Sequence, residues 1–405
     1  MKYLLYITGS ISCYKSIDLC RALINDGHQV IVLLSQAAEK FIKKDIFLYL
    51  GANAAYIHDD DFSSPSKEIR HIELSRWCDF FVVCPASANT ISHLASGTTK
   101  DLGSTIFLAL DEKVQKLIFP AMNTKMLENS IIKNKIKELE SVINITVFPT
   151  EYGELACGEV GAGKLLDIEK IKTILTSWPL VKYPKKVLIS TGASISPLDD
   201  VRYLTNPASG KTGLKLAQKF LQQGYDVSLI TGIYSNEFFQ TLKDHPSFSL
   251  HCAATANDYL RLTEEMINDC DVFISAAAIC DISFNYSAGK MKKETLSRTL
   301  EIHQSPDVLK KMINKKKENQ YFIGFAAESE LTEEMLRKKW ESKKVDLLIG
   351  TEVNSGAKIG STTMGFKTST ANYKIYENKK ISYEGILSKK DLSQMIFEKA
   401  NQWLN

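Results

Sequence analysis

The sequence lacks the patterns that mark several common classes of protein. None of its eight cysteines form a C-x-x-C pair, which argues against a zinc site. No apolar run approaches the about 20 residues that a membrane-spanning helix needs. The formal net charge is only +3, and no G-x-G-x-x-G dinucleotide fingerprint occurs in either half. These absences predict no metal site built from protein ligands, no membrane partner and no nucleic acid partner.

The cysteines and the first segment indicate the compartment. Several cysteines lie inside apolar runs, where a free thiol behaves as a small hydrophobe. The first apolar run, residues 4–8, is too short for the core of a signal peptide and predicts a β-strand. We therefore expect a reducing compartment and a cytoplasmic protein.

Length and patterning predict two domains. The chain has 405 residues, a length that favours two domains over one. Its residues are 44% hydrophobic and 24% charged, which is ordinary for a globular protein. Short apolar runs alternate with amphipathic stretches, which predicts β-α-β units. We expect strands at 4–8, 30–34, 80–84, 117–119 and 145–148, and, after a restart at 185–192, at 226–231, 272–276, 321–325, 346–349 and 373–376. The predicted fold class is α/β, with two Rossmann-like doubly wound parallel-sheet domains at 1–178 and 185–405.

Polar side chains follow several expected strands of the first half. Met122-Asn123 follows the strand at 117–119, and Ser87-Ala88-Asn89-Thr90 follows the strand at 80–84. Gly9-Ser10 and Ser35 stand likewise after the first two strands. Because the carboxyl ends of parallel strands meet at one edge of a sheet, these groups predict a ligand site, with Gly9-Ser10 suited to a phosphate. The alternative is ordinary strand-to-helix turns with Ser87 or Asn89 as a helix cap.

A histidine and a cysteine are candidates for proton transfer. His71 precedes the strand at 80–84, and Cys157 lies in the glycine-rich segment 156–164. We expect this segment to be a flexible flap that can close over a ligand. The alternatives are a structural histidine, the commoner role of a lone His, and a simple mobile connection.

The second half has its own polar strand ends. Asn206 lies in a loop before a helix, Asp281 follows the strand at 272–276, and Phe325 ends the strand at 321–325. The run of Lys290, Lys292 and Lys293 can surround a triphosphate, although clustered lysines usually form a solvated face. A nucleotide site is one interpretation, and a polar loop beside a solvated face is the other.

Four segments of the first half, 9–11, 85–90, 120–123 and 156–159, resemble the flavin-dependent cysteine decarboxylase family in order and spacing. The resemblance implies FMN bound by Gly9, Ser10, Ser35 and the turn of Ser87, Ala88, Asn89 and Thr90, with Met122 beside it. It also implies His71 as catalytic base, Asn123 as the group that binds the substrate carboxylate, and Cys157 as proton donor. In this family the flavin first oxidises the substrate thiol to a thioaldehyde, which gives the electrons of decarboxylation a sink.

Residues 185–400 resemble the phosphopantothenate–cysteine ligase family. The resemblance implies that CTP, with Mg²⁺ on its phosphates, activates a carboxylate as an acyl-cytidylate, which the amine of cysteine then attacks. It places Asn206 at the acyl group, Asp281 at the base and Lys290, Lys292 and Lys293 at the phosphates. It places Pro306, Asp307, Val308 and Phe325 at the nucleotide.

Together the two resemblances imply a bifunctional enzyme of coenzyme A biosynthesis. Its substrates would be 4′-phosphopantothenate, cysteine and CTP, and its product 4′-phosphopantetheine. The families also imply a homo-oligomer, with trimeric packing of the flavin domains and dimeric ligase domains. A flavin-binding regulatory subunit without catalysis and a nicotinamide oxidoreductase are the alternatives.

The second half departs from the family pattern at three places, one of them Ile282 after Asp281, where an aromatic or polar residue is common. Ser194-Ile195-Ser196 stands where the ligases usually have Thr-Arg-Glu, and Thr351-Glu352 replaces an Asn-Asp pair. These departures leave the efficiency of ligation and the preference for CTP over ATP open.

Overall fold

The chain folds as two α/β units. The computed structural model describes residues 1–60, 69–292, 299–353 and 369–404. Its two compact units are Met1–Leu175 and Thr176–Asn405. Among the described residues, no helix is both long and apolar enough to cross a bilayer.

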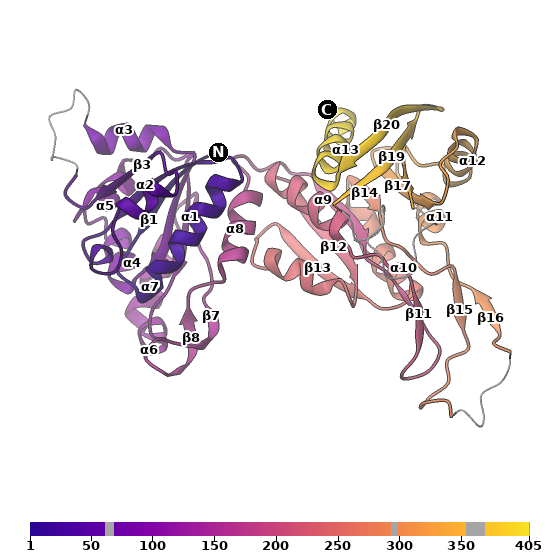
Figure 1. Cartoon of the computed structure of the whole chain (residues 1–405), viewed down its shortest axis with the longest axis horizontal. Helices are drawn as coiled ribbons and strands as arrows, with labels where there is room; N and C mark the ends of the chain where they lie inside the picture. Colours follow the sequence, from indigo (N-terminus) through magenta and orange to yellow (C-terminus); the bar gives the residue numbers. More distant parts are fainter. Residues whose placement is uncertain (61–68, 293–298, 354–368, 405) are drawn as a thin grey trace. The chain divides into compact units, whose positions relative to one another are not determined.

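The first unit is built on a six-stranded parallel sheet (Figure 1). Its strands lie in the order β3-β2-β1-β4-β5-β6, and each neighbouring pair is parallel. They are β1 (Lys2–Ile7), β2 (Gln29–Leu34), β3 (Ala54–Ile57), β4 (Phe80–Ala86), β5 (Gln115–Pro120) and β6 (Ile145–Val147). The α-helices are α1 (Lys15–Asn25), α2 (Asp45–Tyr49), α3 (Arg70–Trp77), α4 (Ala88–Ala95), α5 (Leu102–Ala109), α6 (Thr124–Glu128), α7 (Ser130–Glu140) and α8 (Ile168–Ser177). Two 3₁₀ turns, η1 (Ile11–Tyr14) and η2 (Ala38–Lys40), follow β1 and β2, and β7 (Glu151–Glu154) pairs with β8 (Val160–Lys164) as an antiparallel hairpin.

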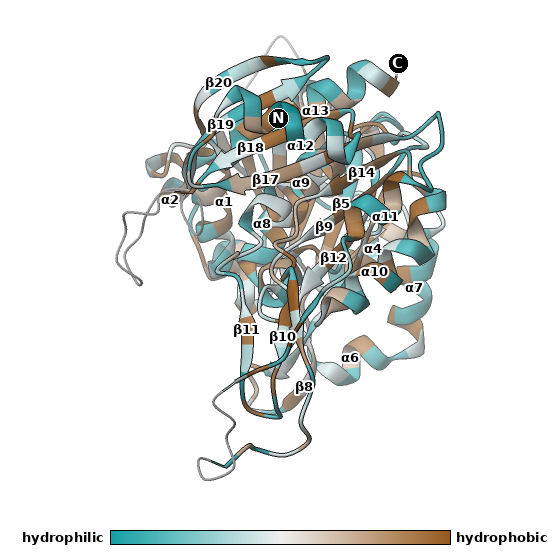
Figure 2. Cartoon of the chain, turned by 90° about the vertical axis from the view of Figure 1, so that its right-hand side faces the viewer, coloured by the Kyte–Doolittle hydropathy of each residue, from teal (hydrophilic) through white to brown (hydrophobic). Residues whose placement is uncertain are grey.

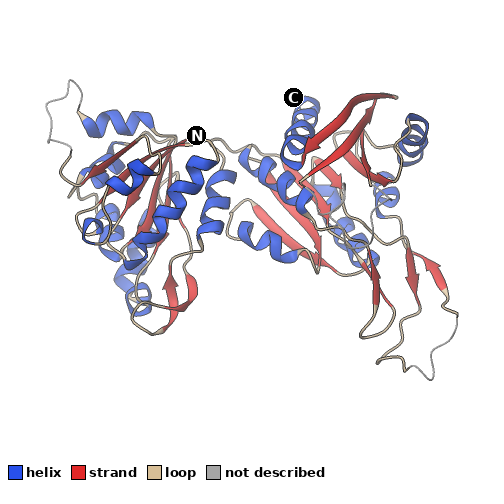
Figure 3. Ribbon diagram, in the orientation of Figure 1, coloured by secondary structure: helices blue, strands red, loops and turns tan. Residues whose placement is uncertain are grey.

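The central strands are apolar on both faces because helices cover both sides of the sheet (Figure 3). All seven residues of β4 are buried. Alternate side chains point to opposite faces, so Leu4 and Phe81 join the core cluster on one face. On the other face Tyr3 stacks against Phe80, with ring centroids 5.1 Å apart.

The second unit repeats this topology and extends it. Its eight-stranded sheet has the order β13-β12-β9-β14-β17-β18-β19-β20. The strands are β9 (Lys186–Thr191), β12 (Asp226–Gly232), β13 (Phe248–Ala253), β14 (Val272–Ser275), β17 (Tyr321–Glu328), β18 (Leu347–Glu352), β19 (Thr370–Glu377) and β20 (Lys380–Ser388). Two short antiparallel ladders join β10 (Ile195–Pro197) to β11 (Tyr203–Thr205) and β15 (Ile282–Phe284) to β16 (Ile302–Gln304). The helices are α9 (Lys211–Gln222), α10 (Ala256–Met266), α11 (Val308–Ile313), α12 (Glu333–Lys343) and α13 (Lys389–Leu404), with 3₁₀ turns η3 (Asn236–Leu242) and η4 (Ile267–Asp269).

Amphipathic helices pack on the two faces of the second sheet. One core cluster includes Leu216 and Phe220 of α9 with Ile396 of α13, and another includes Tyr259 of α10 and Leu336 of α12. Helix α11, for example, carries both hydrophilic and hydrophobic residues in Figure 2. The hydrophobic side chains of such helices cover the apolar strands, which defines two separate cores in this unit.

The structure confirms the fold class expected from the sequence, with one correction. The first six strands of the second sheet repeat the order of the first sheet and are parallel. The expected strand at 373–376 lies within β19, which is antiparallel to β18. Strand β20 then returns through a two-residue turn, Asn378-Lys379, at φ values of 49° and 64°. An antiparallel edge on a largely parallel sheet is common in folds of this class.

A buried tyrosine anchors α8 to the first sheet, which gives a test of the fold. Tyr3 is fully buried, and its hydroxyl donates to the Leu175 carbonyl oxygen at 3.0 Å. We expect Tyr3→Phe to lower the free energy of unfolding of the first unit by about 1–2 kcal/mol, because a buried acceptor loses its donor. Urea unfolding followed by circular dichroism measures the change. Tyr49→Phe is the matched control because Tyr49 is 91% exposed; equal midpoints for the two variants would contradict this role of Tyr3.

Candidate active sites

Each sheet reverses its strand order at one point, and a cavity lies there. The reversal falls between β1 and β4 in the first sheet and between β9 and β14 in the second. In open α/β sheets, ligands bind beyond the carboxyl ends of the strands at such a point. The first cavity, of about 1050 Å³, is lined by residues 9–12 after β1 and 87–90 after β4. The second, of about 630 Å³, is lined by Gly192 after β9 and residues 276–279 after β14.

Thr8 ties the two strand ends of the first cavity together. Its Oγ1 donates to the Pro85 carbonyl oxygen at 2.8 Å and accepts a hydrogen bond from the Ser87 backbone N–H at 2.9 Å. Thr8 is fully buried. These two bonds fix the turn that follows β4 relative to the turn that follows β1.

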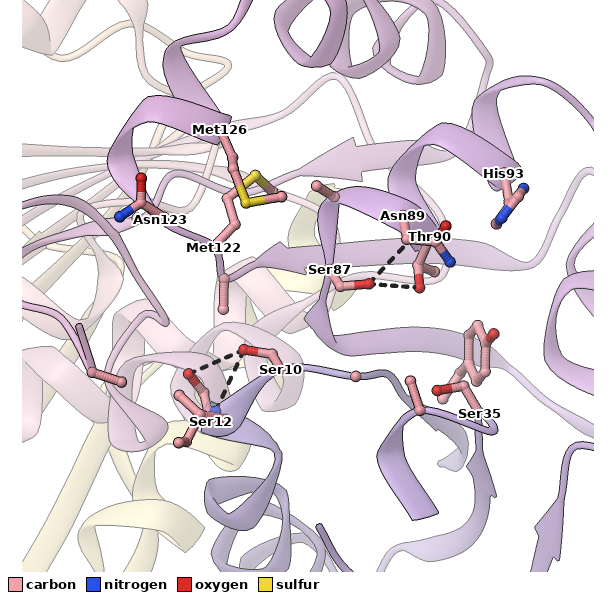
Figure 4. Close-up of a pocket in the computed structure, with 18 of the residues that line it drawn as sticks. Ser10, Ser12, Ser35, Ser87, Asn89, Thr90, His93, Met122, Asn123 and Met126 are labelled. Carbon is pink, nitrogen blue, oxygen red and sulfur yellow. Dashed lines mark hydrogen bonds between the residues drawn. The ribbon is translucent and has the colours of Figure 1, made fainter. Parts of the chain in front are cut away.

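The hydroxyl groups predicted from the sequence surround one open space (Figure 4). Ser87 caps α4, where its Oγ accepts from the Thr90 backbone N–H at 3.3 Å. Ser10 caps η1, and Ser35 accepts from the Ala38 backbone N–H at 3.3 Å. These serines are therefore helix or turn caps and also line the cavity, so the two interpretations of the sequence are compatible. Ala88, Asn89 and Met122 line the cavity as well.

Asn123 is held in one orientation at the edge of this cavity. It caps α6, and its Oδ1 accepts from the Lys125 backbone N–H at 2.9 Å. The Nδ2 group must then point the other way. It donates to Glu159 Oε2 at 2.8 Å and to Cys157 Sγ at 3.4 Å. The structure thus brings together Asn123 and Cys157, which the sequence placed 34 residues apart.

The segment around Cys157, expected from its glycines to be a flexible flap, is part of a hairpin. It forms the turn of the β7–β8 hairpin. Met122 N donates to the Gly163 carbonyl oxygen at 3.0 Å, and a Cβ at Gly163 would lie 2.1 Å from the Met122 carbonyl oxygen. A Cβ at Gly161 would lie 2.3 Å from Thr124 Oγ1. These two glycines therefore permit close packing of the hairpin against the start of α6, and only Gly158, at φ +81° in open space, serves the turn.

His71 lies outside this constellation. It is the second residue of α3, half-buried, and is not among the residues that line the first cavity. Its role as a catalytic base stays a prediction.

Several lining residues were not found from the sequence. Tyr6 donates to Asp101 Oδ2 at 2.7 Å, and Asp101 caps α5 in a capping box with Ser104. His58 lies 2.6 Å from Glu39 Oε1. The Asp-x-x-Ser spacing of the capping box was a usable signal for a helix start, but no local pattern shows that these side chains reach the cavity.

The second cavity gathers most of the residues predicted for the second half. Asn206, Asp281, Pro306, Asp307, Val308 and Phe325 line it. Asn206 Nδ2 donates to the Ala278 carbonyl oxygen at 3.1 Å, which joins the loop before α9 to the loop after β14. Asp307 caps α11 and pairs with Lys343. Burial raises the pKa of the Asp307 carboxyl, but the hydrogen bond and charge of Lys343 outweigh it and hold the pKa below its usual value.

The lysines that line the second cavity are not those predicted. Lys290 and Lys292 are exposed and lie outside its lining, and Lys293 falls outside the described residues. Lys211, Lys339, Lys343 and Lys389 line it instead. They come from the first turns of α9 and α13 and from α12, where a lysine in an amphipathic helix has no distinguishing local signal.

The loop that carries Lys290 and Lys292 is nevertheless tied to the turn 197–202. The buried Asp199 accepts from the Met291 backbone N–H at 3.1 Å, and Arg202 donates to the Met291 carbonyl oxygen at 3.0 Å. Arg202 Nε also donates to Asp199 Oδ2 at 2.9 Å. Asp200 accepts from the Gly289 backbone N–H at 2.9 Å. Two adjacent carboxylates therefore hold the lysine loop at both ends of Lys290.

The departures near residue 195 have structural roles. Ser194 Oγ accepts from the Cys280 backbone N–H at 2.8 Å, and Ser196 Oγ donates to the Ile282 carbonyl oxygen at 2.5 Å. Both bonds flank Asp281. The two serines thus position the loop that carries this carboxylate.

Two compact units, each with a cavity at its topological switch point, define a two-site α/β protein. Residues 1–179 match the Flavoprotein family, and residues 183–404 match the "DNA/pantothenate metabolism flavoprotein C-terminal domain" family.

Among curated relatives, the coenzyme A biosynthesis bifunctional protein CoaBC of Bacillus subtilis is 34% identical over 372 residues, covering 89% of this chain and 88% of the relative. The protein of the same name from Vibrio vulnificus is 32% identical over 360 residues, 87% of each chain. A solved structure of a PPC decarboxylase mutant with pantothenoylaminoethenethiol is 30% identical, covering 43% of this chain and 95% of that chain at a TM-score of 0.40.

The chain therefore belongs to the family of coenzyme A biosynthesis bifunctional proteins, and its first unit is a flavoprotein. The first cavity fits a flavin. Hydroxyls and a 3₁₀ turn suit its phosphate, and Leu94, Met122 and Met126 offer apolar surface for the rings. His93 Nε2, also at the cavity, is buried with no hydrogen-bond partner among the described residues. At Gly9 an added Cβ would lie 2.3 Å from Ala37 Cβ, so the backbone approaches the next turn closely.

The fixed orientation of Asn123 gives a sharp test. We expect Asn123→Asp to keep α6 and flavin binding, because aspartate also caps helices. The new carboxylate would face Glu159 and any substrate carboxylate, so we expect decarboxylation to fall by about 100-fold or more, the usual effect of losing one donor to a charged group. The flavin absorbance and CO₂ release of the purified variant measure the two properties. CO₂ release at the parent rate would remove Asn123 from substrate binding.

Proposed function

We propose that this protein makes 4′-phosphopantetheine in two steps. The second unit joins cysteine to 4′-phosphopantothenate using CTP, through an acyl-cytidylate. The first unit decarboxylates the resulting 4′-phosphopantothenoylcysteine using FMN. Two relatives of the same printed name, each matched over most of its length, support this assignment.

The observation that carries the decarboxylase half is the contact between Asn123 and Cys157. A side-chain amide whose N–H groups point into a cavity suits a carboxylate. A thiol 3.4 Å away can supply a proton to the carbon that loses CO₂. A flavin-binding regulatory subunit without catalysis would not need this pair, and the absence of G-x-G-x-x-G disfavours a nicotinamide oxidoreductase.

The residues of the first unit divide the chemistry among them. FMN, when bound, would accept two electrons from the substrate thiol and, as the reduced flavin, would return them to the product at the end. Gly9, Ser10 and Ser35 would hold its phosphate, and residues 87–90 would contact the rest of the cofactor. Asn123 holds the substrate carboxylate until CO₂ leaves, and Cys157 then donates a proton. His71 is proposed as the base that accepts the proton of the substrate thiol.

The second unit would bind CTP in its cavity, beyond the carboxyl ends of β9 and β14. Asp281 can accept from the exocyclic amine of cytosine, and Phe325 can pack on the base. Asn206 would contact the acyl group, and residues 306–308 lie where α11 begins, a favourable place for an anion. Lys290 and Lys292 would reach the phosphates from their tethered loop, with Lys293 proposed beside them.

Three finer assignments belong to the same proposal. Mg²⁺ is proposed to enter on the triphosphate, since no group of three or more His, Cys, Asp or Glu that could hold a metal occurs in the part of the chain that the structure describes. We also propose a cytoplasmic homo-oligomer with trimeric flavin units and dimeric ligase units. Cys157 and seven further cysteines are free, which suits a reducing compartment.

The test of the whole proposal is turnover with defined substrates. Purified protein is incubated with 4′-phosphopantothenate, cysteine and an equimolar mixture of CTP, ATP and UTP, and the products are identified by mass. We expect 4′-phosphopantetheine, CO₂, CMP and pyrophosphate. Consumption of ATP or UTP in place of CTP would overturn the nucleotide assignment, and a product that keeps the cysteine carboxylate would overturn the decarboxylase.

The proton donor can be tested separately. We expect Cys157→Ser to oxidise and decarboxylate the substrate but to accumulate an oxidised enethiol product, because a hydroxyl is a far weaker acid than a thiol of pKa about 8.5. Mass spectrometry distinguishes this product, two hydrogens lighter, from 4′-phosphopantetheine. Cys252→Ser is a control because Cys252 is likewise an exposed free thiol but lies in β13 of the other unit. Normal 4′-phosphopantetheine from Cys157→Ser would exclude Cys157 as the donor.

The lysine loop gives a test of the ligase half. We expect Lys290→Gln to raise the KM for CTP by about tenfold, the effect of one lost charged hydrogen bond. Decarboxylation of supplied 4′-phosphopantothenoylcysteine should stay at the parent rate, because the two cavities lie in separate units. Lys315→Gln is the control, since Lys315 pairs with Glu264 on the surface. An unchanged KM would show that the loop is only a solvated face.

A further inference from the structure

Glu159 contacts both of the groups assigned to decarboxylation. Its Oε2 accepts a hydrogen bond of 2.8 Å from Asn123 Nδ2 and lies 3.7 Å from Cys157 Sγ. Asn123 Nδ2 also donates to Cys157 Sγ at 3.4 Å. The three side chains form a closed triangle of polar contacts at the edge of the first cavity.

The turn of the hairpin fixes Glu159 relative to Cys157. Leu155 N donates to the Glu159 carbonyl oxygen at 2.8 Å, and Gly158 N donates to the Leu155 carbonyl oxygen at 2.9 Å. Gly158 supplies the left-handed backbone that this turn requires, at φ +81°. Cys157 and Glu159 therefore move as one piece with the turn.

Glu159 carries a negative charge at neutral pH. The hydrogen bond from Asn123 and the nearby charge of Lys125 hold the pKa of its carboxyl below the usual value. An amide of fixed orientation that binds this carboxylate is the same amide that the proposed function assigns to the carboxylate of the substrate. Two carboxylates on one amide repel each other, so they compete.

We propose that Glu159 is a positioning residue that competes with the substrate carboxylate for the Asn123 amide and returns to it after CO₂ has left. Binding of substrate displaces Glu159 and, with it, the turn that carries Cys157. Loss of CO₂ removes the competing charge, so Glu159 returns to the amide and brings the Cys157 thiol back beside Asn123. Because the substrate carboxylate and Glu159 share the Asn123 amide as donor, CO₂ must leave before Glu159 returns. Protonation by Cys157 therefore follows decarboxylation. This inference rests on the proposed role of Asn123 in binding the substrate carboxylate.

The test uses two ligands that cannot react because they lack a thiol. One is 4′-phosphopantothenoylalanine, which keeps the carboxylate, and the other is 4′-phosphopantothenoylethylamine, which does not. Calorimetry on the flavin-loaded full chain gives a Kd for each. The ratio of the two values measures the contribution of the carboxylate alone, independent of turnover and of general effects on folding.

We expect Glu159→Gln to strengthen binding of the carboxylate ligand about fivefold, from the loss of a competing hydrogen bond and charge. Binding of the ethylamine ligand should not change. Glu159→Ala, whose side chain cannot bond Asn123, should show the same gain in affinity for the carboxylate ligand. Glu159→Asp keeps the charge, so its ratio of the two Kd values should stay near that of the parent protein. Glu128→Gln, which removes an exposed carboxylate from the end of α6, is the control for net charge.

Each result decides the question. An unchanged ratio in both Glu159→Gln and Glu159→Ala overturns the competition, as does equal weakening of both ligands, which would mean that Glu159 only holds the turn. A gain shared by Glu128→Gln would assign the effect to net charge and also overturn it. If the parent protein converts 4′-phosphopantothenoylcysteine but the ratio does not move, only this inference fails; if it does not convert that substrate, the proposed function fails first.

Discussion

The reversal of strand order at the centre of each sheet is the constraint on which the other features depend. It leaves the carboxyl ends of β1 and β4, and of β9 and β14, side by side with helices that start on opposite faces. The turns there must be held together by something other than strand pairing. In the first unit Thr8 does this through two hydrogen bonds, and in the second Asn206 joins the loops through Ala278. Each cavity is thus a consequence of topology, and its shape is set by a few buried polar contacts.

Helix capping gives the site side chains their direction. Asn123, Ser87 and Asp307 all cap helices at the cavity edge. A cap contributes about 1 kcal/mol of stability and removes rotamer freedom from the same side chain. For Asn123 the cap consumes Oδ1 and leaves both N–H groups for other partners. The competition that we infer between Glu159 and substrate follows from this division, because only one face of the amide is available.

The periodic pattern of the sequence predicted most strands of the two large sheets, although not β3, β13 or β20, and the residues that follow them, since both depend on local chemistry. It located Gly9, Ser87 and Asn123 at one edge because parallel strands end together. It missed the Tyr6–Asp101 contact and the lysines of α12, because helix packing decides which side chains reach a cavity. The glycines of the hairpin were interpreted as flexibility, whereas Gly161 and Gly163 allow close packing that only tertiary structure reveals. The placement of His71 outside the cavity lining could not be foreseen for the same reason.

The charges of the second cavity bear on how a triphosphate would bind. Its lining carries four lysines and three acidic side chains, and two of the lysines are paired with Glu328 and Asp307. Little positive charge is left to balance the several negative charges of a triphosphate. Burial first, and then the charge of Lys211, lowers the pKa of Lys389, so two ammonium groups already repel each other there. Additional cations must therefore come from outside the lining. Under the proposed function, Lys290 and Lys292, whose loop is tethered through Met291 to Asp199 and Arg202, would supply them together with Mg²⁺.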